Sequence, residues 1–170
     1  MLHANRNARV TIESGLHLSC RLSIKGPGSV RIGKRCTIHG IPGARVNMVT
    51  LYTHDPEATI AIGQDAVLVA ARFSSRFAID IGNAVVIEDA SLLDTDFHSL
   101  DRSRRVPADE TLEQCRITVG DEVSIGSRAI IGKGVSVGKG SVVHPGSVVQ
   151  KSFPDHVEIM GNPARIVDKH

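Results

Sequence analysis

A chain of 170 residues is long enough for one domain with a buried core, and its composition narrows the class of that domain. Aromatic residues make up only 3% of the chain and tryptophan is absent, whereas valine, isoleucine, alanine and glycine are plentiful, which indicates a narrow interior. The net charge of +2 is too small to indicate binding to nucleic acid or to an anionic membrane surface.

Signals for export or membrane insertion are also missing. The first residues, MLHANRNARVTIE, contain no apolar stretch of the kind found in secretory signals, and no run approaches the roughly 18 apolar residues of a spanning helix. Three cysteines, an odd number, fit a reducing compartment better than a disulfide framework. We therefore expect a cytoplasmic protein without a membrane span.

The first half of the chain carries pairs of apolar or small residues two positions apart, most of them recurring at a spacing of six. On an extended segment, residues two apart point to the same side, which here is the core. The pairs are Val10/Ile12, Leu16/Leu18, Leu22/Ile24, Val30/Ile32, Cys36/Ile38, Ile60/Ile62, Ala66/Leu68, Ile79/Ile81, Val85/Ile87 and Ser91/Leu93. Residues 40–57 lose the spacing and contain Pro42, Gly43 and Pro56, which predicts an irregular coil there.

Residues 94–116, which we call the excursion, interrupt the pattern with the polar segment DTDFHSLDRSRRVPADETLEQCR. A polar loop of this length inside a compact domain is either functional or disordered. Phe97, Leu100 and Leu112 give it apolar anchorage, so we favour a functional segment.

The most regular repeat begins directly after the excursion. Its apolar anchors stand at every sixth position: Val119, Ile125, Ile131, Val137, Val143 and Val149. Glycine follows four of the anchors, where a sharp corner would need it. A period of six fits neither a helical stripe nor a hairpin, and it is the signature of a parallel β-helix, in which three units close one triangular coil. The tail, residues 150–170, leaves the repeat.

The hexapeptide run, the histidine-bearing excursion before it and the closing phrase Gly161-Asn162-Pro163-Ala164-Arg165 resemble the hexapeptide acyltransferases, which use acetyl-CoA. Within that superfamily the arrangement is similar to sugar and polysaccharide O-acetyltransferases of the galactoside and maltose type. The resemblance implies an all-β fold, a left-handed parallel β-helix forming one domain over residues 1–170. In that domain, 94–116 would be the active-site loop, and three copies would pack as a homotrimer with each acyl site between two neighbours.

Three residues of the excursion suit general-base catalysis. Imidazole is the usual base near neutral pH, and Asp94, Asp96 and His98 are spaced two apart, so they face one side if the segment is extended. A carboxylate beside the ring would fix its tautomer and raise its basicity. His98 also matches by position the catalytic histidine of the resembling family. We therefore predict His98 as the base, oriented by either Asp94 or Asp96.

The resemblance also implies residues that hold acetyl-CoA, the expected acyl donor. Ser127 matches a position whose backbone amide helps to hold the thioester region. The positions that match the pantetheine and phosphate path are Pro145, Gly146, Gln150, Lys151 and Arg165. Pro145 has no N–H, so it cannot donate to the pantetheine. The zinc-dependent γ-type carbonic anhydrases of this architecture carry two histidines five residues apart on one coil; this chain has no such pair, and we predict no metal.

These observations predict direct transfer of an acetyl group from acetyl-CoA to a hydroxyl of a sugar or polysaccharide precursor. Two alternatives stay open: N-acetylation of an amino sugar on a nucleotide carrier, and a non-catalytic β-helix that serves as a scaffold subunit. The sequence does not separate O-acylation from N-acylation.

Overall fold

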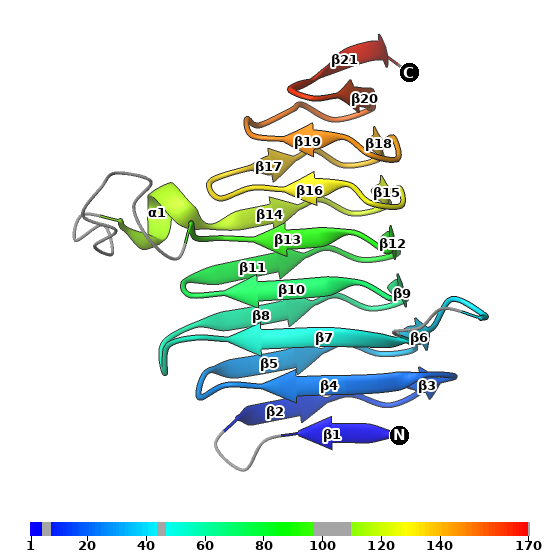
Figure 1. Cartoon of the computed structure of the whole chain (residues 1–170), viewed down its shortest axis with the longest axis vertical. Coiled ribbons are helices and arrows are strands. Elements are labelled where there is room, and N and C mark those ends of the chain that lie inside the picture. The colour runs from blue at the N-terminus through cyan, green and yellow to red at the C-terminus, as the bar shows by residue number, and fades with distance from the viewer. Residues whose placement is uncertain (5–7, 44–46, 97–109, 170) are drawn as a thin grey trace.

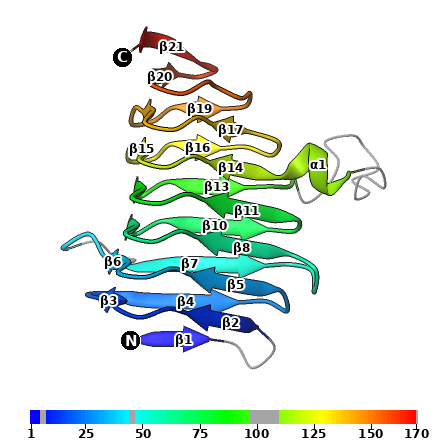
Figure 2. The same cartoon turned by 180° about the vertical axis from the view of Figure 1, so that it is seen from behind.

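The computed structural model describes residues 1–4, 8–43, 47–96 and 110–169. The chain rises as a stack of three-sided coils, with its two ends at opposite ends of the stack (Figures 1 and 2). From β1 to β19, consecutive strands lie on consecutive faces, which we call A, B and C, so every third strand returns to the same face. This is a parallel β-helix, and the all-β prediction from the period of six is confirmed.

Within the described ranges, each face is one sheet. Face A consists of β1 (Leu2–Ala4), β4 (Arg21–Lys25), β7 (Met48–Thr53), β10 (Arg72–Ser75), β13 (Ser91–Leu93), β16 (Ile130–Ile131) and β19 (Val148–Val149). Face B consists of β2 (Arg9–Ile12), β5 (Ser29–Ile32), β8 (Thr59–Ile62), β11 (Ala78–Ile81), β14 (Ile117–Val119) and β17 (Ser136–Val137). Face C consists of β3 (His17–Leu18), β6 (Thr37–His39), β9 (Val67–Val69), β12 (Val86–Glu88), β15 (Ser124–Ile125), β18 (Val142–Val143), β20 (Val157–Gly161) and β21 (Ala164–Lys169). The neighbours pair in parallel, except that β21 runs antiparallel to β20.

The core is a column of the predicted inward anchors. Ile60, Ile131 and Val149 are each at most 1% exposed, and they form one continuous apolar cluster with the anchors of the other coils. A single coil cannot cover its own apolar faces, so each coil depends on its neighbours about 4.8 Å away.

One predicted inward pair is wrong. Ser91 and Leu93 are half-buried and point outward, whereas Leu92 is 0% exposed and pairs with the buried Phe73 of the coil below. The corner at Asp89, which has a positive φ of 42°, shortens the spacing between anchors, and a shift of one residue on a pleated strand exchanges the two sides. The correction puts Ser91 and Leu93 on the outer surface of face A.

Residues 40–57 are more regular than their lost spacing predicts. They contain the six-residue strand β7, which pairs with β4 and β10. Val49 and Leu51 are buried inward residues of this strand, but they lie out of phase with Cys36 and Ile38, so a search at fixed spacing misses them.

The excursion leaves the prism where face A meets face B, between β13 and β14, and we call this edge the A–B corner. Its described end is the short helix α1 (Leu112–Cys115), which projects from the side of the prism (Figure 1). Thr111 caps the helix by accepting a hydrogen bond from the backbone N–H of Gln114. Cys115 is buried, and its carbonyl accepts a hydrogen bond from Gly134 on the next coil, which ties α1 to the prism. Among the described residues, no helix has the length and apolar character to cross a membrane.

Candidate active site

A cluster of charged side chains lies at the A–B corner, where the excursion begins and ends. Lys133 Nζ lies 2.5 Å from Asp96 Oδ2 and 2.7 Å from Glu110 Oε1. These hydrogen bonds, first that of Asp96 and then that of Glu110, raise the pKa of Lys133, so the side chain stays a cation. Lys133 therefore joins the two described ends of the excursion across the gap of residues 97–109.

A second cation reaches the same cluster from the coil below. Arg76 Nη1 lies 3.8 Å from Glu110 Oε2, and its Nε lies 3.1 Å from Asp55 Oδ2. The side chain of Glu110 is only 9% exposed, so its charge is compensated by Arg76 and Lys133 rather than by solvent.

Asp94 has a structural environment. Its buried carboxylate accepts hydrogen bonds from Ser75 Oγ at 2.7 Å, from the backbone N–H of Arg76 at 2.7 Å and from that of Phe77 at 2.9 Å. Burial raises the pKa of Asp94, and the three hydrogen bonds oppose that rise. The carboxylate thus fixes the turn between β10 and β11.

Of the other two predicted catalytic residues, the structure describes Asp96 but not His98. The side chain of Asp96 is 51% exposed, and its described contact to Lys133 uses Oδ2 only. His98 lies outside the described residues.

A cavity of about 300 Å³ lies beside this cluster on the outer surface of face A. Gly132 leaves its floor open, because a Cβ at that position would meet nothing nearer than the Val149 carbonyl at 3.4 Å. Asp96 and Lys133 line one side of this cavity, which we call the Gly132 pit, and Leu93 and Gln150 line its lower and upper ends.

A further cavity of about 290 Å³, the Arg165 pit, lies directly above. Its lining residues are Gln150, Lys151, Pro163, Ala164 and Arg165. Three predicted donor-binding residues therefore meet in one place, and two of them are cations suited to phosphate oxygens. Gln150 lines both pits, so the Arg165 pit and the Gly132 pit adjoin along the axis of the prism.

The remaining predicted donor-binding residues lie at the opposite edge of face A. Ser127 precedes β16 and Pro145-Gly146 precede β19, whereas Gln150 follows β19; in parallel strands these are opposite ends. The backbone N–H of Gly146 donates to the Ser127 carbonyl at 2.9 Å, which joins the two corners of successive coils. Pro145 lines a separate cavity of about 210 Å³ on face C. Within one chain, the residues predicted to bind acetyl-CoA therefore lie at two opposite edges of face A.

The sequence-based predictions missed Lys133, Glu110 and Arg76. A signal was present for Lys133, because Ile131 pairs with Val149 and so Lys133 occupies the same corner position as Lys151 one coil later. No periodicity indicates Glu110, since it lies in the excursion. In the part of the chain that the structure describes, no group of three or more histidine, cysteine or acidic side chains is placed to hold a metal ion.

Residues 116–151 match the family model of the bacterial transferase hexapeptide repeat, described as six repeats. Over this segment the chain is similar to that family, and the fold of the whole described chain is that of the left-handed parallel β-helix. No curated protein matches its sequence.

Solved structures with the same fold include several acyltransferases. A hexapeptide-repeat acetyltransferase from Vibrio cholerae O1 biovar eltor, solved with acetyl coenzyme A, is 27% identical, with 96% of this chain and 70% of that chain covered and a TM-score of 0.54. Galactoside acetyltransferase in complex with coenzyme A is 23% identical, with 94% of this chain and 64% of that chain covered and a TM-score of 0.57. This chain therefore spans less than two thirds of the length of that protein.

A third neighbour carries out a different acylation. A mutant of AntD, an N-acyltransferase from Bacillus cereus, was solved with dTDP-4-amino-4,6-dideoxyglucose and coenzyme A. It is 16% identical, with 94% of this chain and 83% of that chain covered and a TM-score of 0.68. At that identity the likeness to AntD supports the fold alone.

Proposed function

We propose that this protein transfers an acetyl group from acetyl-CoA to a hydroxyl group of a sugar or polysaccharide precursor. The observation that carries the proposal is the adjoining of two cavities on face A: the Gly132 pit beside Asp96 and the Arg165 pit lined by Lys151 and Arg165. A donor with an acyl thioester at one end and phosphates at the other needs such an arrangement. The Vibrio cholerae acetyltransferase, solved with acetyl coenzyme A, supports the choice of donor.

In this proposal the donor lies along the axis of the prism. Lys151 and Arg165 bind its phosphate groups through charge-assisted hydrogen bonds, and Gln150 lies where the pantetheine passes between the pits. The thioester reaches the Gly132 pit, whose open floor leaves room for the acyl group.

His98 acts as the general base. It takes the proton of the acceptor hydroxyl while that oxygen forms a bond to the thioester carbonyl carbon, and the C–S bond then breaks. The proton passes from the imidazole to the departing thiolate, so the products are an acetyl ester and the free thiol. We assign the orientation of His98 to Asp96, because the oxygens of Asp94 already accept three hydrogen bonds.

The division of the donor set between two edges supports a homotrimer. Ser127, Pro145 and Gly146 lie at the edge of face A opposite the Arg165 pit, at the other end of β16 and β19. In a ring of three copies, this edge of one copy would complete the site at the A–B corner of the next.

The central experiment measures thiol release from acetyl-CoA with a panel of sugar acceptors. We expect His98→Ala to lose about 10²–10⁴ in kcat, and Asp96→Asn to lose less, because the charge that stabilises the imidazolium goes but the base stays. The matched control is His39→Ala, on face C, which should behave like wild type. A His98→Ala enzyme that keeps more than about a tenth of the wild-type kcat would remove His98 from this role.

The donor assignment has its own readout. Arg165→Ala should raise the KM for acetyl-CoA with little change in kcat, because a cation at a phosphate group stabilises the ground state and the transition state alike. Arg31→Ala, an exposed arginine on face B, is the control. An unchanged KM in Arg165→Ala would contradict the proposed path.

N-acylation of an amino sugar is the second candidate, because AntD has the same fold and was solved with an amino sugar on a nucleotide. Acceptors that differ only in carrying an amine or a hydroxyl group separate the two reactions. A scaffold subunit would release no thiol with any acceptor and would not bind acetyl-CoA.

A further inference from the structure

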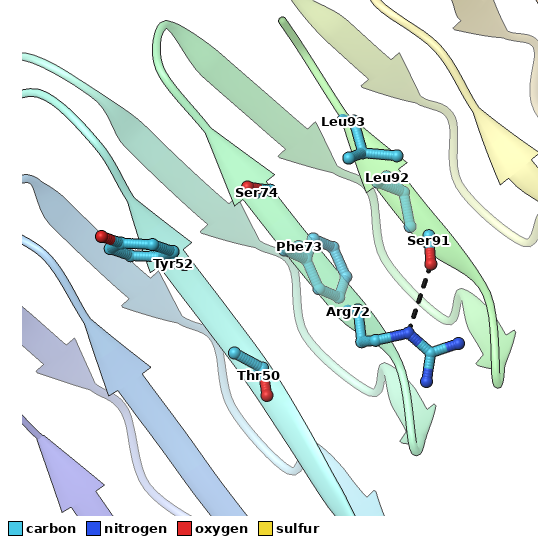
Figure 3. A pocket seen from close by; sticks show the side chains of 8 residues that line it. All are labelled: Thr50, Tyr52, Arg72, Phe73, Ser74, Ser91, Leu92 and Leu93. Atoms are coloured by element: carbon cyan, nitrogen blue, oxygen red, sulfur yellow. Dashed lines mark hydrogen bonds between the residues drawn. The ribbon is translucent and has the colours of Figure 1, made fainter. Parts of the chain in front are cut away.

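A third cavity lies on the outer surface of face A, below the Gly132 pit (Figure 3). In the strand register, Ser74 of β10 lies between Tyr52 of β7 and Leu93 of β13. A small side chain between two large ones leaves a space of about 290 Å³, which we call the apolar hollow. Leu93 also lines the Gly132 pit, so the two spaces adjoin.

The polar groups around the apolar hollow are already paired with one another. His54 Nε2 lies 2.8 Å from Ser74 Oγ. At the other end, the guanidinium of Arg72 donates to Ser91 Oγ at 3.3 Å (Figure 3) and to Asp89 Oδ1 at 3.0 Å. Such groups offer few hydrogen bonds to a polar ligand, and they keep their own when hydrocarbon covers them. The apolar hollow therefore suits an apolar ligand.

Tyr52 gives the apolar hollow a fixed aromatic wall. It is the only tyrosine of the chain and is 40% exposed. The ring of His54 packs against it, with 4.1 Å between the ring centroids, and His54 is in turn held by its contact with Ser74. Because the ring is already held in place, a ligand that packs against it loses little free energy in ordering it.

The outward side chains of face A alternate in size along the axis of the prism. The pairing of Leu92 with Ile131 places Leu93 beside Gly132, and Ser74 lies on the other side of Leu93. Ser74 and Gly132 are therefore the floors of two neighbouring spaces, and Leu93 is the ridge between them. Since neighbouring strands lie about 4.8 Å apart, the two floors are about 10 Å apart.

We propose that the apolar hollow binds the hydrocarbon tail of a donor whose acyl chain is longer than acetyl, so that the protein also takes medium-chain acyl-CoA. This inference rests on the proposed transfer from acetyl-CoA and extends the class of donor. The thioester lies in the Gly132 pit, the chain crosses Leu93, and its end packs against Tyr52. The shared wall of the two spaces favours this occupant over a segment of a second copy.

The spacing of the two floors gives the length of the chain. An extended chain advances about 1.2 Å per bond, because the three bonds of one extended residue span about 3.6 Å. A butyryl chain therefore ends at the ridge, about 4.8 Å from the floor of the Gly132 pit, whereas chains of about six to eight carbon atoms pass Leu93 and enter the apolar hollow.

The first test measures the dissociation constants of acetyl-, butyryl-, hexanoyl- and octanoyl-CoA by isothermal titration calorimetry. Each methylene group that moves from water to an apolar surface strengthens binding about fourfold. We expect a small change from acetyl to butyryl, and a Kd that falls about tenfold or more from butyryl to octanoyl. A Kd that stays constant along the series would overturn the inference.

Two variants then locate the chain. Ser74→Leu fills the floor of the apolar hollow and should remove the gain for octanoyl-CoA while the Kd for acetyl-CoA holds. Tyr52→Ala removes the aromatic wall and should weaken the binding of octanoyl-CoA alone. The control Ser136→Leu makes the same change on the outer surface of face B and should keep the gain.

Other occupants of the apolar hollow give different results with the same variants. A gain for octanoyl-CoA that survives in both Ser74→Leu and Tyr52→Ala would place the chain elsewhere and overturn the inference. A changed oligomeric state in light scattering, with the same preference for chain length, would assign the apolar hollow to a contact between copies and also overturn it.

Thiol release separates this inference from the proposed function. Tight binding of octanoyl-CoA that Ser74→Leu removes, without thiol release from any CoA ester and any acceptor, would contradict the proposed transfer and leave the subsite standing. Thiol release from acetyl-CoA together with a constant Kd along the series would overturn the subsite alone. If no CoA ester binds, both are overturned.

Discussion

Asp94 and Asp96 are two positions apart in the chain and have opposite surroundings. Asp94 is buried and accepts three hydrogen bonds, two of them from backbone N–H groups. Asp96 is half exposed and pairs with Lys133. A spacing of two indicates the same side only while the chain stays extended, and the strand ends at Leu93. The first carboxylate therefore stabilises the prism, and the second remains at the proposed active site.

The two carboxylates should respond differently to the same substitution. Asp94→Asn turns an amide NH2 toward groups that are themselves donors, so at least one buried hydrogen bond is lost, at a cost of about 1–3 kcal/mol in the free energy of unfolding. Asp96→Asn should leave that free energy almost unchanged, because its pairing is exposed. Urea unfolding of both variants checks this, and equal midpoints would contradict the structural role of Asp94.

At the A–B corner, the short helix α1 packs against the coil above it. Gly134 has a φ of +71°, and a Cβ there would lie 2.4 Å from the carbonyl oxygen of Gln114. The glycine therefore serves both the turn and the close approach of the helix. Through this approach the end of the excursion is fixed to the same coil that carries Lys133.

Gly134→Ala should destabilise the protein more than Gly146→Ala does. Gly146 has nearly the same φ, +72°, but no atom lies within 4 Å of the position of an added Cβ. Gly146→Ala should therefore lose only the free energy of backbone strain, about 1 kcal/mol. Gly134→Ala adds the displacement of α1. Unfolding free energies give the difference, and hydrogen exchange of the Arg116 amide, which bonds to Leu112, should quicken only in Gly134→Ala. If both variants lose the same free energy of unfolding, the contact between α1 and Gly134 does not contribute to stability.

How much of each element could be predicted depends on how constant its corners are. After Ile117 the corners repeat without change, and the inward anchors are confirmed to the last coil. Near Asp89 one corner is shorter, so a fixed period placed Ser91 and Leu93 on the wrong side of the strand. Together with Tyr52 and Ser74, these two residues line the apolar hollow on the outer surface of face A, so that hollow could not be foreseen from the repeat.

On the scale of the whole molecule, face A connects every part of the proposed reaction. The Gly132 pit and the Arg165 pit adjoin along it and share Gln150. Gln150, Lys151 and Arg165 could be predicted to act together because they lie near one another in the chain and at one corner. The separation of Ser127 from them was not predicted, because the sequence-based assignment put all these residues on one ligand, whereas the folded chain places them at opposite ends of β16 and β19.

Adjacent residues of β16 offer a test of the whole assembly. Ile131 is 0% exposed, so Ile131→Asp would bury an unpaired charge and cost several kcal/mol, which should unfold the chain. Ile130 is 41% exposed on face A, so Ile130→Asp should keep the fold but weaken the proposed trimer. Circular dichroism and light scattering separate the outcomes. An Ile131→Asp protein as heat-resistant as wild type would contradict the register of the prism.

The position of the excursion has a consequence for how such proteins can diverge. It enters at a corner where β13 ends at Leu93 and leaves where β14 begins at Ile117, whereas the equivalent corner of a later coil runs only from Ile131 to Ser136. The strands on either side keep their pairing with neighbours above and below. A descendant could therefore exchange the segment between Asp94 and Cys115 for another while the pairing of β13 and β14 with their neighbours is kept. The choice of substrate could then change through exchange of the excursion alone, while the coils of the prism keep their structure.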